Sequence, residues 1–420
     1  MKNYKVIVSS CVANIFEWYD YTLFIYYAVI ITDKFFPTVD KSVVLLQSFL
    51  IFAIGYLMRP IGGIFFGIIG DKFGRKESLA MSIMCMSLPT VIIGILPTYQ
   101  SIGITATIVI TITRILQGLS VGGNLTGSVS FLIEHSTEKT RGFFGSLPMS
   151  GLCIGILLGS LTSHLIKVSL TIEQFNEWGW RIPFLLGAPI VFVGIYIRYN
   201  IKETPIFEKI KKAGKISNAP LKKVLQFHWQ EIVISIVINS TGSVIFYLEA
   251  VYLLNYLKIG RGFNEVSVDS LNKICCVIMA VVALLSGWVS DQIGRKRLYM
   301  IIIFIIIILT IPIIRLLEQE DFMLVAFSQV IIAILAAFYI GAEPALQAAL
   351  YHDNIRNTAL SLSYNISTSI FGGTSPIIFE YLVQTTKSLK FCAYYIILCA
   401  AISFIGLCFY KENSKITVDD

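Results

Sequence analysis

The run Gly67-Ile-Ile-Gly70-Asp71-Lys72-Phe73-Gly74-Arg75-Lys76 recurs 220 positions later as Gly287-Trp-Val-Ser290-Asp291-Gln292-Ile293-Gly294-Arg295-Lys296. Each copy follows one long apolar stretch and precedes another. The repetition predicts two homologous halves. Because each copy places an acidic residue, a glycine and an arginine in a tight turn between apolar helices, it also indicates a hinge that holds one shape and then releases it. We therefore expect a chain that changes conformation.

The composition is that of a protein that crosses a membrane many times. Of the 420 residues, 55% are hydrophobic and 14% are charged, and the mean hydropathy is +0.75. A helix needs about 20 apolar residues to cross the hydrocarbon core. Twelve stretches meet this need, near 10–32, 45–70, 79–97, 102–133, 143–166, 182–198, 229–257, 268–290, 298–316, 321–350, 357–385 and 390–410. We predict an all-α membrane protein with twelve transmembrane helices.

The one long polar stretch divides these spans into six and six. We predict an N-terminal half over 1–199, a cytoplasmic linker over 200–228, and a C-terminal half with a short tail over 229–420. The first apolar stretch contains Glu17 and Asp20 and lacks a small-residue cleavage site, so we interpret it as a retained span. Most of the 33 Lys and Arg lie in the linker, in the loops on the same side of the membrane as the linker, and at the two chain ends. The positive-inside rule then places the linker and both chain ends in the cytoplasm.

The charge and the metal-ligating residue types exclude several functions. The net charge of +7 is explained by this topology, so no nucleic-acid partner is needed to account for it. The eight cysteines and four histidines show no metal-ligand spacing, and no Gly-Lys-Ser/Thr phosphate-binding loop is present. We expect no metal, no cofactor and no enzymatic activity, and an ion gradient as the source of energy.

Motifs beyond the repeated turn support a resemblance that runs from residue 14 to about 380. They include Glu17-Trp18-Tyr19-Asp20-Tyr21, Arg59-Pro60-Ile-Gly62-Gly63, Arg114-Ile-Leu-Gln117-Gly118, Gly179-Trp180-Arg181, Glu203-Thr204-Pro205 and Tyr364-Asn365. Their order and spacing resemble the metabolite:proton symporter branch of the major facilitator superfamily, which includes bacterial proline/betaine, α-ketoglutarate and citrate transporters. The resemblance implies the major facilitator fold, with two pseudo-symmetric halves of six helices. It also implies a gating motif that stabilises the outward-facing state, formed by Gly67, Asp71, Gly74, Arg75, Gly287, Asp291, Gly294 and Arg295.

The chain departs from this branch at two places. Asn124 stands where the branch usually has an acidic residue after the paired glycines of the fourth span, so any role of that carboxylate is lost or moved here. The tail after Tyr410 is too short for the coiled coil that osmosensing relatives carry. Osmotic regulation by such a coiled coil is therefore not expected.

Six ionisable side chains inside the spans are the candidates for coupling, because burying them costs a few kcal/mol each. Glu17 and Asp20 are three residues apart and share a helix face. Two carboxylates so close in a low-dielectric cavity should not both ionise readily, so the pair is suited to carry a proton. Our hypothesis is that protonation of the pair weakens an ion pair with Arg59 or Arg114 and lets the carrier reorient. The alternative is a static buried ion pair that fixes helix packing.

The candidate substrate-binding residues are compatible with either a positively or a negatively charged group on the substrate. Aromatic residues such as Trp18 and Tyr21 beside a carboxylate would suit a quaternary ammonium, although such rings also commonly face lipid. Arg59 or Arg114 would instead clamp a carboxylate. Glu343 precedes Pro344, which weakens the helix locally. The candidate substrate-binding residues are Trp18, Tyr21, Asn124, Glu249, Glu343 and Asn365.

These features together predict a proton-coupled symporter that imports a small polar metabolite such as proline or betaine by alternating access. The alternatives are a dicarboxylate or α-ketoglutarate symporter, an exchanger, or a solute sensor that does not transport. We expect a monomer in the inner membrane of a bacterium, with protons, a small-molecule substrate and the lipid bilayer as its partners.

Overall fold

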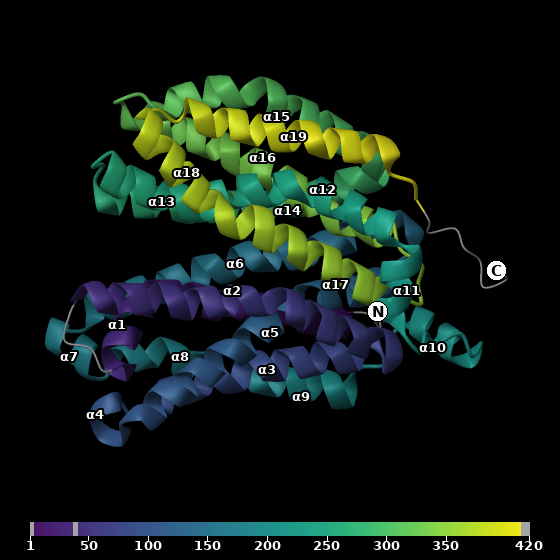
Figure 1. Cartoon of the computed structure of the whole chain (residues 1–420), viewed down its shortest axis with the longest axis horizontal. Helices are drawn as coiled ribbons and strands as arrows, with labels where there is room; N and C mark the ends of the chain where they lie inside the picture. Colours follow the sequence, from purple (N-terminus) through teal and green to yellow (C-terminus); the bar gives the residue numbers. More distant parts are fainter. Residues whose placement is uncertain (1–3, 37–40, 413–420) are drawn as a thin grey trace.

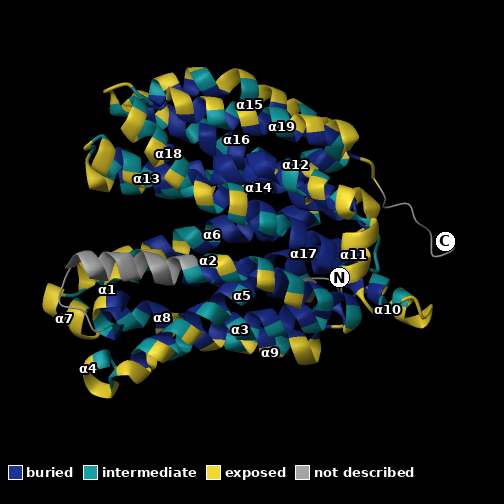
Figure 2. Ribbon diagram, viewed as in Figure 1, coloured by how far each residue is buried: buried dark blue, intermediate teal, exposed yellow. Residues whose placement is uncertain are grey.

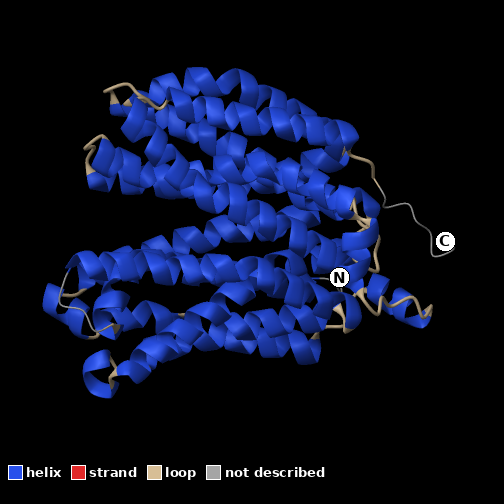
Figure 3. Cartoon of the chain, viewed as in Figure 1, coloured by secondary structure: helices blue, strands red, loops and turns tan. Residues whose placement is uncertain are grey.

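Helices make up nearly all of the protein, and no strand occurs in the described residues (Figure 3). The structure is a computed structural model that describes residues 4–36 and 41–412, with the backbone alone at 4, 6 and 41–53. The last eight residues of the predicted tail lie outside the described residues. The first half contains α1 (Tyr4–Phe35), α2 (Lys41–Lys72), α3 (Arg75–Ile95), α4 (Tyr99–Ile102), α5 (Ile104–His135), η1 (Glu138–Thr140), α6 (Arg141–Ser169), α7 (Ile172–Glu177), η2 (Gly179–Arg181), α8 (Ile182–Leu186) and α9 (Ile190–Asn200).

Two short helices follow, α10 (Pro205–Lys212) and α11 (Pro220–Phe227). The second half contains α12 (Trp229–Tyr247), η3 (Leu248–Tyr252), α13 (Leu253–Asn255), η4 (Tyr256–Gly260), α14 (Glu265–Ile293), α15 (Arg295–Leu317), α16 (Phe322–Ala348), α17 (Arg356–Ser367), η5 (Thr368–Gly372), α18 (Gly373–Thr386) and α19 (Lys390–Phe409). Figure 1 shows most helices up to α9 below those from α12 onward, with α6 and α17 at the boundary between the two groups. The short helices α10 and α11 lie at one end of the long helices, at the right of Figure 1, and this end is called the linker end below.

Nine helical segments of the described chain are long and apolar enough to cross a membrane: α3, α5, η1 with α6, η2 to α9, α12 to η4, α14, α15, α16 and α19. The other three predicted spans coincide with α1, α2 and the continuous run from α17 to α18. The helical stretches therefore occur where the sequence predicts them. The number of membrane crossings stays a prediction.

The outer surface is rich in exposed apolar side chains, whereas the buried residues lie within and between the two groups of helices (Figure 2). Phe192, Trp288 and Phe304 are examples, with 71%, 55% and 62% of their surface exposed. Exposed apolar surface of this extent would be unfavourable in water. It suits a chain whose outer face contacts lipid.

The two groups meet along long helices, mainly α2 against α17 and α6 against α14. Glycines make this approach possible. A Cβ on Gly67 would lie 2.8 Å from the Thr358 Cα, and a Cβ on Gly287 would lie 2.6 Å from the Gly142 carbonyl oxygen. These distances are shorter than van der Waals contact. Gly67 and Gly287 therefore permit the close approach of helices from the two groups.

Two of the long helical runs widen into π-helical turns, at η3 and η4 after α12 and at η5 between α17 and α18. Pro376 lies just after η5, and its missing N–H cannot bond the Gly372 carbonyl four residues earlier. Such turns interrupt the regular hydrogen-bond ladder and often mark functional positions in helices. Both interrupted runs contribute side chains to the cavity described next.

Candidate functional site

A cavity with about 340 Å³ of empty space lies between the two halves. Its wall is built from α1, α2 and α6 of the first half and from α12, α16, α17 and η5 of the second. The lining residues are Trp18, Arg59, Met149, Leu152, Asn239, Gly242, Ser243, Phe246, Tyr247, Ile340, Glu343, Tyr364 and Thr368. A site shared by both halves changes its shape when the halves move relative to each other.

Arg59 brings a buried positive charge to this cavity. Its guanidinium donates from Nη1 to the Tyr247 hydroxyl at 3.3 Å and lies 5.3 Å from the centroid of the Tyr56 ring. Its Nε has no hydrogen-bond partner, and no salt bridge joins Arg59 to a described carboxylate. Arg59 therefore keeps an unused donor and an uncompensated charge at the cavity wall.

Glu343 brings a carboxyl group to the same cavity from α16. Its Oε1 accepts a hydrogen bond from Gln347 Nε2 at 2.6 Å, and no salt bridge to a described basic residue involves it. Glu343 also lines a second cavity of about 220 Å³, which shares Met149 and Tyr364 with the first. Pro344 follows it and cannot donate to the carbonyl of Ile340, another residue of the cavity wall. The predicted weakening of this helix is thus located at the cavity.

Aromatic rings surround the cavity. The Trp18 ring lies 6.0 Å from Phe246 at 80° and 5.2 Å from Tyr21 at 61°. The Tyr56 hydroxyl donates to the Tyr247 hydroxyl, which joins the rings of the two halves. Trp18 and Tyr21 are buried, so these two rings do not face lipid. Tyr21 contacts the cavity residue Trp18 without lining the cavity itself.

Glu17 and Asp20 form a separate polar cluster inside the first half. Glu17 Oε2 accepts from Asn124 Nδ2 at 2.6 Å. Asp20 accepts from Thr90 Oγ1 at 2.7 Å and from Gln117 Nε2 at 2.8 Å. Both carboxyl groups are buried and border a small cavity of about 290 Å³. The helical spacing had predicted that they share a face, and they do.

The predicted ion pair between this cluster and an arginine is not present among the described residues. Arg114 donates from Nη1 to Gln117 Oε1 at 2.7 Å, and the amide of Gln117 then donates to Asp20. Gln117 therefore stands between the charges. Arg59 points instead to the cavity between the halves. The guanidinium of Arg114 lies 3.5 Å from the centroid of the Phe24 ring.

Three predicted substrate residues lie away from the central cavity. Asn124 bonds Glu17, as described above, and Asn365 donates to the Gly122 carbonyl at 2.6 Å, where it joins the two halves. Glu249 faces the interior of the second half, where its Oε1 accepts from Gln329 Nε2 at 3.0 Å. Helix packing causes this difference, because it turns these side chains toward their neighbouring helices.

The sequence interpretation missed several cavity residues on α12 and α17. Asn239, Ser243 and Tyr247 follow one another at intervals of four, as do Tyr364 and Thr368. Residues four apart lie on the same face of a helix. A polar stripe on an otherwise apolar span was therefore the signal that could have found them.

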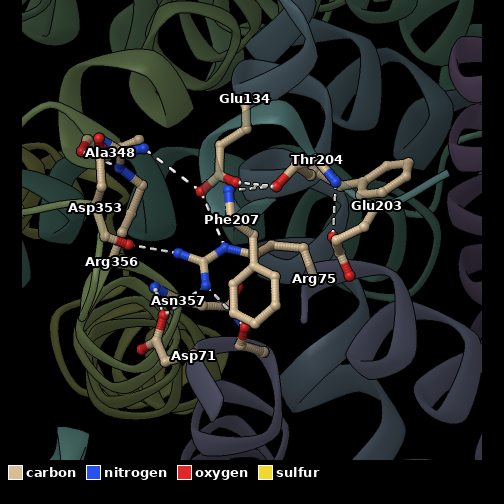
Figure 4. A network of polar contacts seen from close by, with 12 residues as sticks. Asp71, Arg75, Glu134, Glu203, Thr204, Phe207, Ala348, Asp353, Arg356 and Asn357 are labelled. Carbon is tan, nitrogen blue, oxygen red and sulfur yellow. Dashed lines mark hydrogen bonds and ion pairs between the residues drawn. The ribbon is translucent and has the colours of Figure 1, made fainter. Parts of the chain in front are cut away.

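The first copy of the repeated turn forms a buried network between the halves (Figure 4). Asp71 accepts from the backbone N–H groups of Asn357 at 3.2 Å and Thr358 at 2.8 Å, at the start of α17. Arg75 pairs with Asp71 at 3.3 Å and with Glu134 at 3.0 Å. Asp71 therefore both pairs with Arg75 and caps the start of α17.

The segment after α9 packs onto this network. Glu203 accepts from the Lys76 N–H with both oxygens at 3.2 Å, and Thr204 Oγ1 donates to Glu134 Oε2 at 2.6 Å. The Phe207 ring lies 5.2 Å from the Arg75 guanidinium carbon. Burial raises the pKa of the Glu203 carboxyl above its ordinary value, against hydrogen bonds from Thr204 and Lys76 and the charge of Arg75. The start of the linker is thus part of the network.

The second copy makes the reciprocal contact. Asp291 accepts from the N–H groups of Gly142 at 2.7 Å and Phe143 at 2.9 Å, at the start of α6. Arg295 pairs with Glu412 at 2.9 Å and donates to the Glu138 carbonyl at 3.4 Å. Each turn therefore caps a helix of the opposite half. Such paired contacts are suited to hold the two halves together at the linker end.

Comparison with known protein families agrees with this architecture. Residues 6–227 match the family model described as "Sugar (and other) transporter", and residues 274–416 match the model of the "Major Facilitator Superfamily". The chain belongs to the major facilitator superfamily. These matches confirm the predicted family, the multi-pass membrane class and the prediction that the chain is not an enzyme, because the matched families and relatives are transporters.

Within the superfamily, the chain is similar to proteins named as proline/betaine transporters. It is 31% identical to the glycine betaine/proline/ectoine/pipecolic acid transporter OusA of Dickeya dadantii, over 98% of this chain and 84% of that protein. It is 32% identical to a putative proline/betaine transporter of Staphylococcus aureus strain COL, over 96% of this chain and 87% of the relative. It is 31% identical to the proline/betaine transporter of Salmonella typhimurium, over 98% and 84%.

Solved structures of the superfamily share the fold. The proton:xylose symporter XylE bound to 6-bromo-6-deoxy-D-glucose matches with a TM-score of 0.75 at 16% identity, over 97% of this chain and 94% of that one. FucP in its outward conformation matches with a TM-score of 0.71 at 15% identity, over 97% and 98%. The predicted major facilitator fold is confirmed.

Proposed function

We propose that this major facilitator protein is a proton-coupled symporter that imports a small zwitterion of the proline or betaine type by alternating access. One observation carries the proposal: Arg59 and Glu343 line the same cavity, yet neither forms a salt bridge with a described residue. Buried charges without partners are costly. A ligand that carries both charges would relieve both costs at once.

A zwitterion fits this arrangement group by group. Its carboxylate can accept hydrogen bonds from the unused donors of Arg59. Its ammonium can lie near Glu343 and against the faces of Trp18, Phe246, Tyr247 or Tyr364. Relatives named as proline/betaine transporters, at 31–32% identity, support the same substrate class.

A dicarboxylate is the weaker alternative. Arg59 is the sole basic residue among those that line the described cavity, and Glu343 would repel a second carboxylate. An exchanger or a sensor would use the same cavity, so transport assays must separate these from a symporter.

We propose that the cluster of Glu17 and Asp20, with Asn124 and Arg114, couples proton movement to this site. Asp20 has two hydrogen-bond donors and a nearby arginine, whereas Glu17 has Asn124 Nδ2 and one oxygen without a partner. Glu17 is therefore the easier of the two to protonate. The choice of the proton as the coupling ion is supported by analogy of fold, because XylE is a proton:xylose symporter of the same superfamily.

We propose that residues 1–199 and 229–420 are the two rocking halves and that 200–228 is a cytoplasmic linker. The linker end then faces the cytoplasm with both chain ends, in the inner membrane of a bacterium, and the protein acts as a monomer within the bilayer. On this assignment the contacts of Asp71 and Asp291 close the cytoplasmic side and must break before substrate is released inward.

Uptake by proteoliposomes under an imposed pH gradient tests the function. Betaine and proline should accumulate, α-ketoglutarate and citrate should not, and collapse of the gradient should abolish accumulation. Arg59→Gln should abolish zwitterion uptake, whereas the exposed Arg198→Gln should not. Accumulation of dicarboxylates in place of zwitterions would overturn the substrate class, and counterflow without gradient-driven accumulation would overturn proton coupling.

A further inference from the structure

Glu249 is a buried carboxyl group that the proposed mechanism does not use. It lies in η3, the π-helical turn that continues α12, and 1% of its surface is exposed. Its neighbours come from two other helices of the second half, Gln329 on α16 and Cys275 on α14. The preceding turn of the same helix carries Phe246 and Tyr247, which line the central cavity. Glu249 therefore lies directly behind the candidate substrate site.

No basic side chain compensates Glu249. Among the described residues it takes part in no salt bridge, and Gln329 donates to it from a neutral amide. An ionised carboxylate at this depth without a cation would be costly. The thiol of Cys275 is a weak donor and offsets little of that cost. The environment therefore favours the neutral acid.

The hydrogen-bond pattern gives an independent argument. Glu249 Oε2 and Gln329 Oε1 are both buried and both lack a hydrogen-bond partner. Two acceptor oxygens are thus present and a donor is missing. A protonated Glu249 carboxyl has a donor to offer, whereas the ionised form has none. The ionised form would leave the same site with acceptors alone, which is the costly arrangement.

Asp20 in the first half shows the opposite environment. Its two oxygens accept from Thr90 and Gln117, and Arg114 lies behind Gln117. Donors therefore satisfy its ionised form. Both oxygens of Asp20 therefore have donors, whereas one oxygen of Glu249 has none.

We propose that Glu249 is a second proton-binding site of the transport cycle. Glu249 carries its proton in the conformation described here and releases it when η3 and the helical segment after it move. The proton binds to the carboxylate from water and returns to water, so no other reactant is needed. The π-helical turn supplies the mobile element, because its hydrogen bonds run from residue 253 to residue 248 and not at the usual α-helical spacing. This inference rests on the proposed function, since it adds one proton to a proton-coupled cycle.

The experiment measures the number of protons transported per substrate. Wild type and Glu249→Gln are reconstituted in proteoliposomes, and the ratio is obtained from the membrane potential and pH gradient at which net substrate flux reverses. Glutamine has nearly the shape of the neutral acid, so counterflow should persist while the ratio falls by one proton. Glu265→Gln, at an exposed position in the same half, is the control and should keep the wild-type ratio.

An unchanged ratio in an active Glu249→Gln protein would overturn the inference and leave the proposed function intact. Wild-type protein without any proton-coupled uptake would instead be a failure of the proposed function. Uptake that requires sodium in wild type and loses this requirement in Glu249→Gln would also overturn the inference, because the site would then bind a metal cation.

Infrared spectroscopy gives a second test that does not depend on transport. The spectrum of wild type should contain a protonated-carboxyl band that is lost in Glu249→Gln, and an unchanged band would overturn the proposal. Gln329→Leu keeps the carboxyl group and removes its donor, so it should shift this band and serves if Glu249→Gln does not fold. An unshifted band in Gln329→Leu would likewise count against Glu249.

Discussion

Asp71 and Asp291 make the same contact in the two copies of the repeated turn. Each accepts from the N–H groups of the second and third residues of a helix in the opposite half, α17 for Asp71 and α6 for Asp291. The first N–H groups of a helix have no partner within it and carry its positive dipole end. The aspartate cap is therefore the part that both copies keep.

The arginines of the two turns differ. Arg75 is buried between Asp71 and Glu134, whereas Arg295 reaches the surface and pairs with Glu412. The reason lies in later helices of each half, because α5 carries Glu134 next to its last residue, whereas the end of α16 has no acidic residue between Pro344 and Tyr351. One turn anchors a buried charged network, and the other is a cap whose arginine pairs with a half-exposed glutamate.

The linker adds to this difference. A Cβ on Gly74, where φ is 122°, would lie 2.1 Å from Glu203 Oε2, whereas a Cβ on Gly294, where φ is 93°, would meet nothing within 4 Å. Both positions need glycine for the backbone. Only the first is also crowded by the chain that joins the halves. Of the two turns, the first is therefore the one that contacts the linker.

The largest expected effect separates the two arginines. Arg75→Ala leaves Asp71 buried without its cation and leaves Glu134 with Arg356 as its remaining cation, which should destabilise the closed linker end by about 3–5 kcal/mol. Arg295→Ala breaks an exposed pair and should cost less than about 1 kcal/mol. Thermal unfolding and labelling of a cysteine placed near the linker end measure both. Equal effects of the two substitutions would contradict the comparison.

A smaller effect should be shared by both turns. Asp71→Asn and Asp291→Asn keep the side-chain shape but remove the charge from a helix N-terminus, at a cost of about 0.5–2 kcal/mol each. Asp71→Asn should be the more damaging of the two, because it also removes a partner of Arg75. The same labelling assay reports both. A neutral outcome for Asp291→Asn would mean that the cap at α6 does not hold the halves together.

Helical periodicity predicted which residues share a face but not which neighbouring helix that face meets. The repeat, the spans, the pairing of Glu17 with Asp20 on one face and the close approach at Gly67 and Gly287 follow from spacing within one segment. The position of Arg59 does not, because it depends on the rotation of α2 against α12, which places it beside Tyr247.

The contacts of Arg75 illustrate the same limit. Its partners lie 59 residues away at Glu134 and 278 residues away at the Asp353 carbonyl. The motif predicted that Asp71 and Arg75 act together. The motif could not predict which distant helix ends would complete the network. Tertiary packing alone brings these groups to one place.

The smallest expected effect concerns Glu203, which has no counterpart at the second turn. Burial raises the pKa of its carboxyl in the docked linker. Since the docked state has the higher pKa, protonation favours docking. This stabilisation is fully present below the pKa of an exposed carboxyl and is lost as the pH rises through the raised pKa.

Acidifying the linker side should therefore slow labelling near Gly74 in wild type, and this pH dependence should be weaker in Glu203→Gln. Labelling near Gly294 provides the matched control, because no atom of the described residues lies within 4 Å of a Cβ placed there. If the two sites responded to pH alike, the difference between the turns would not come from the linker.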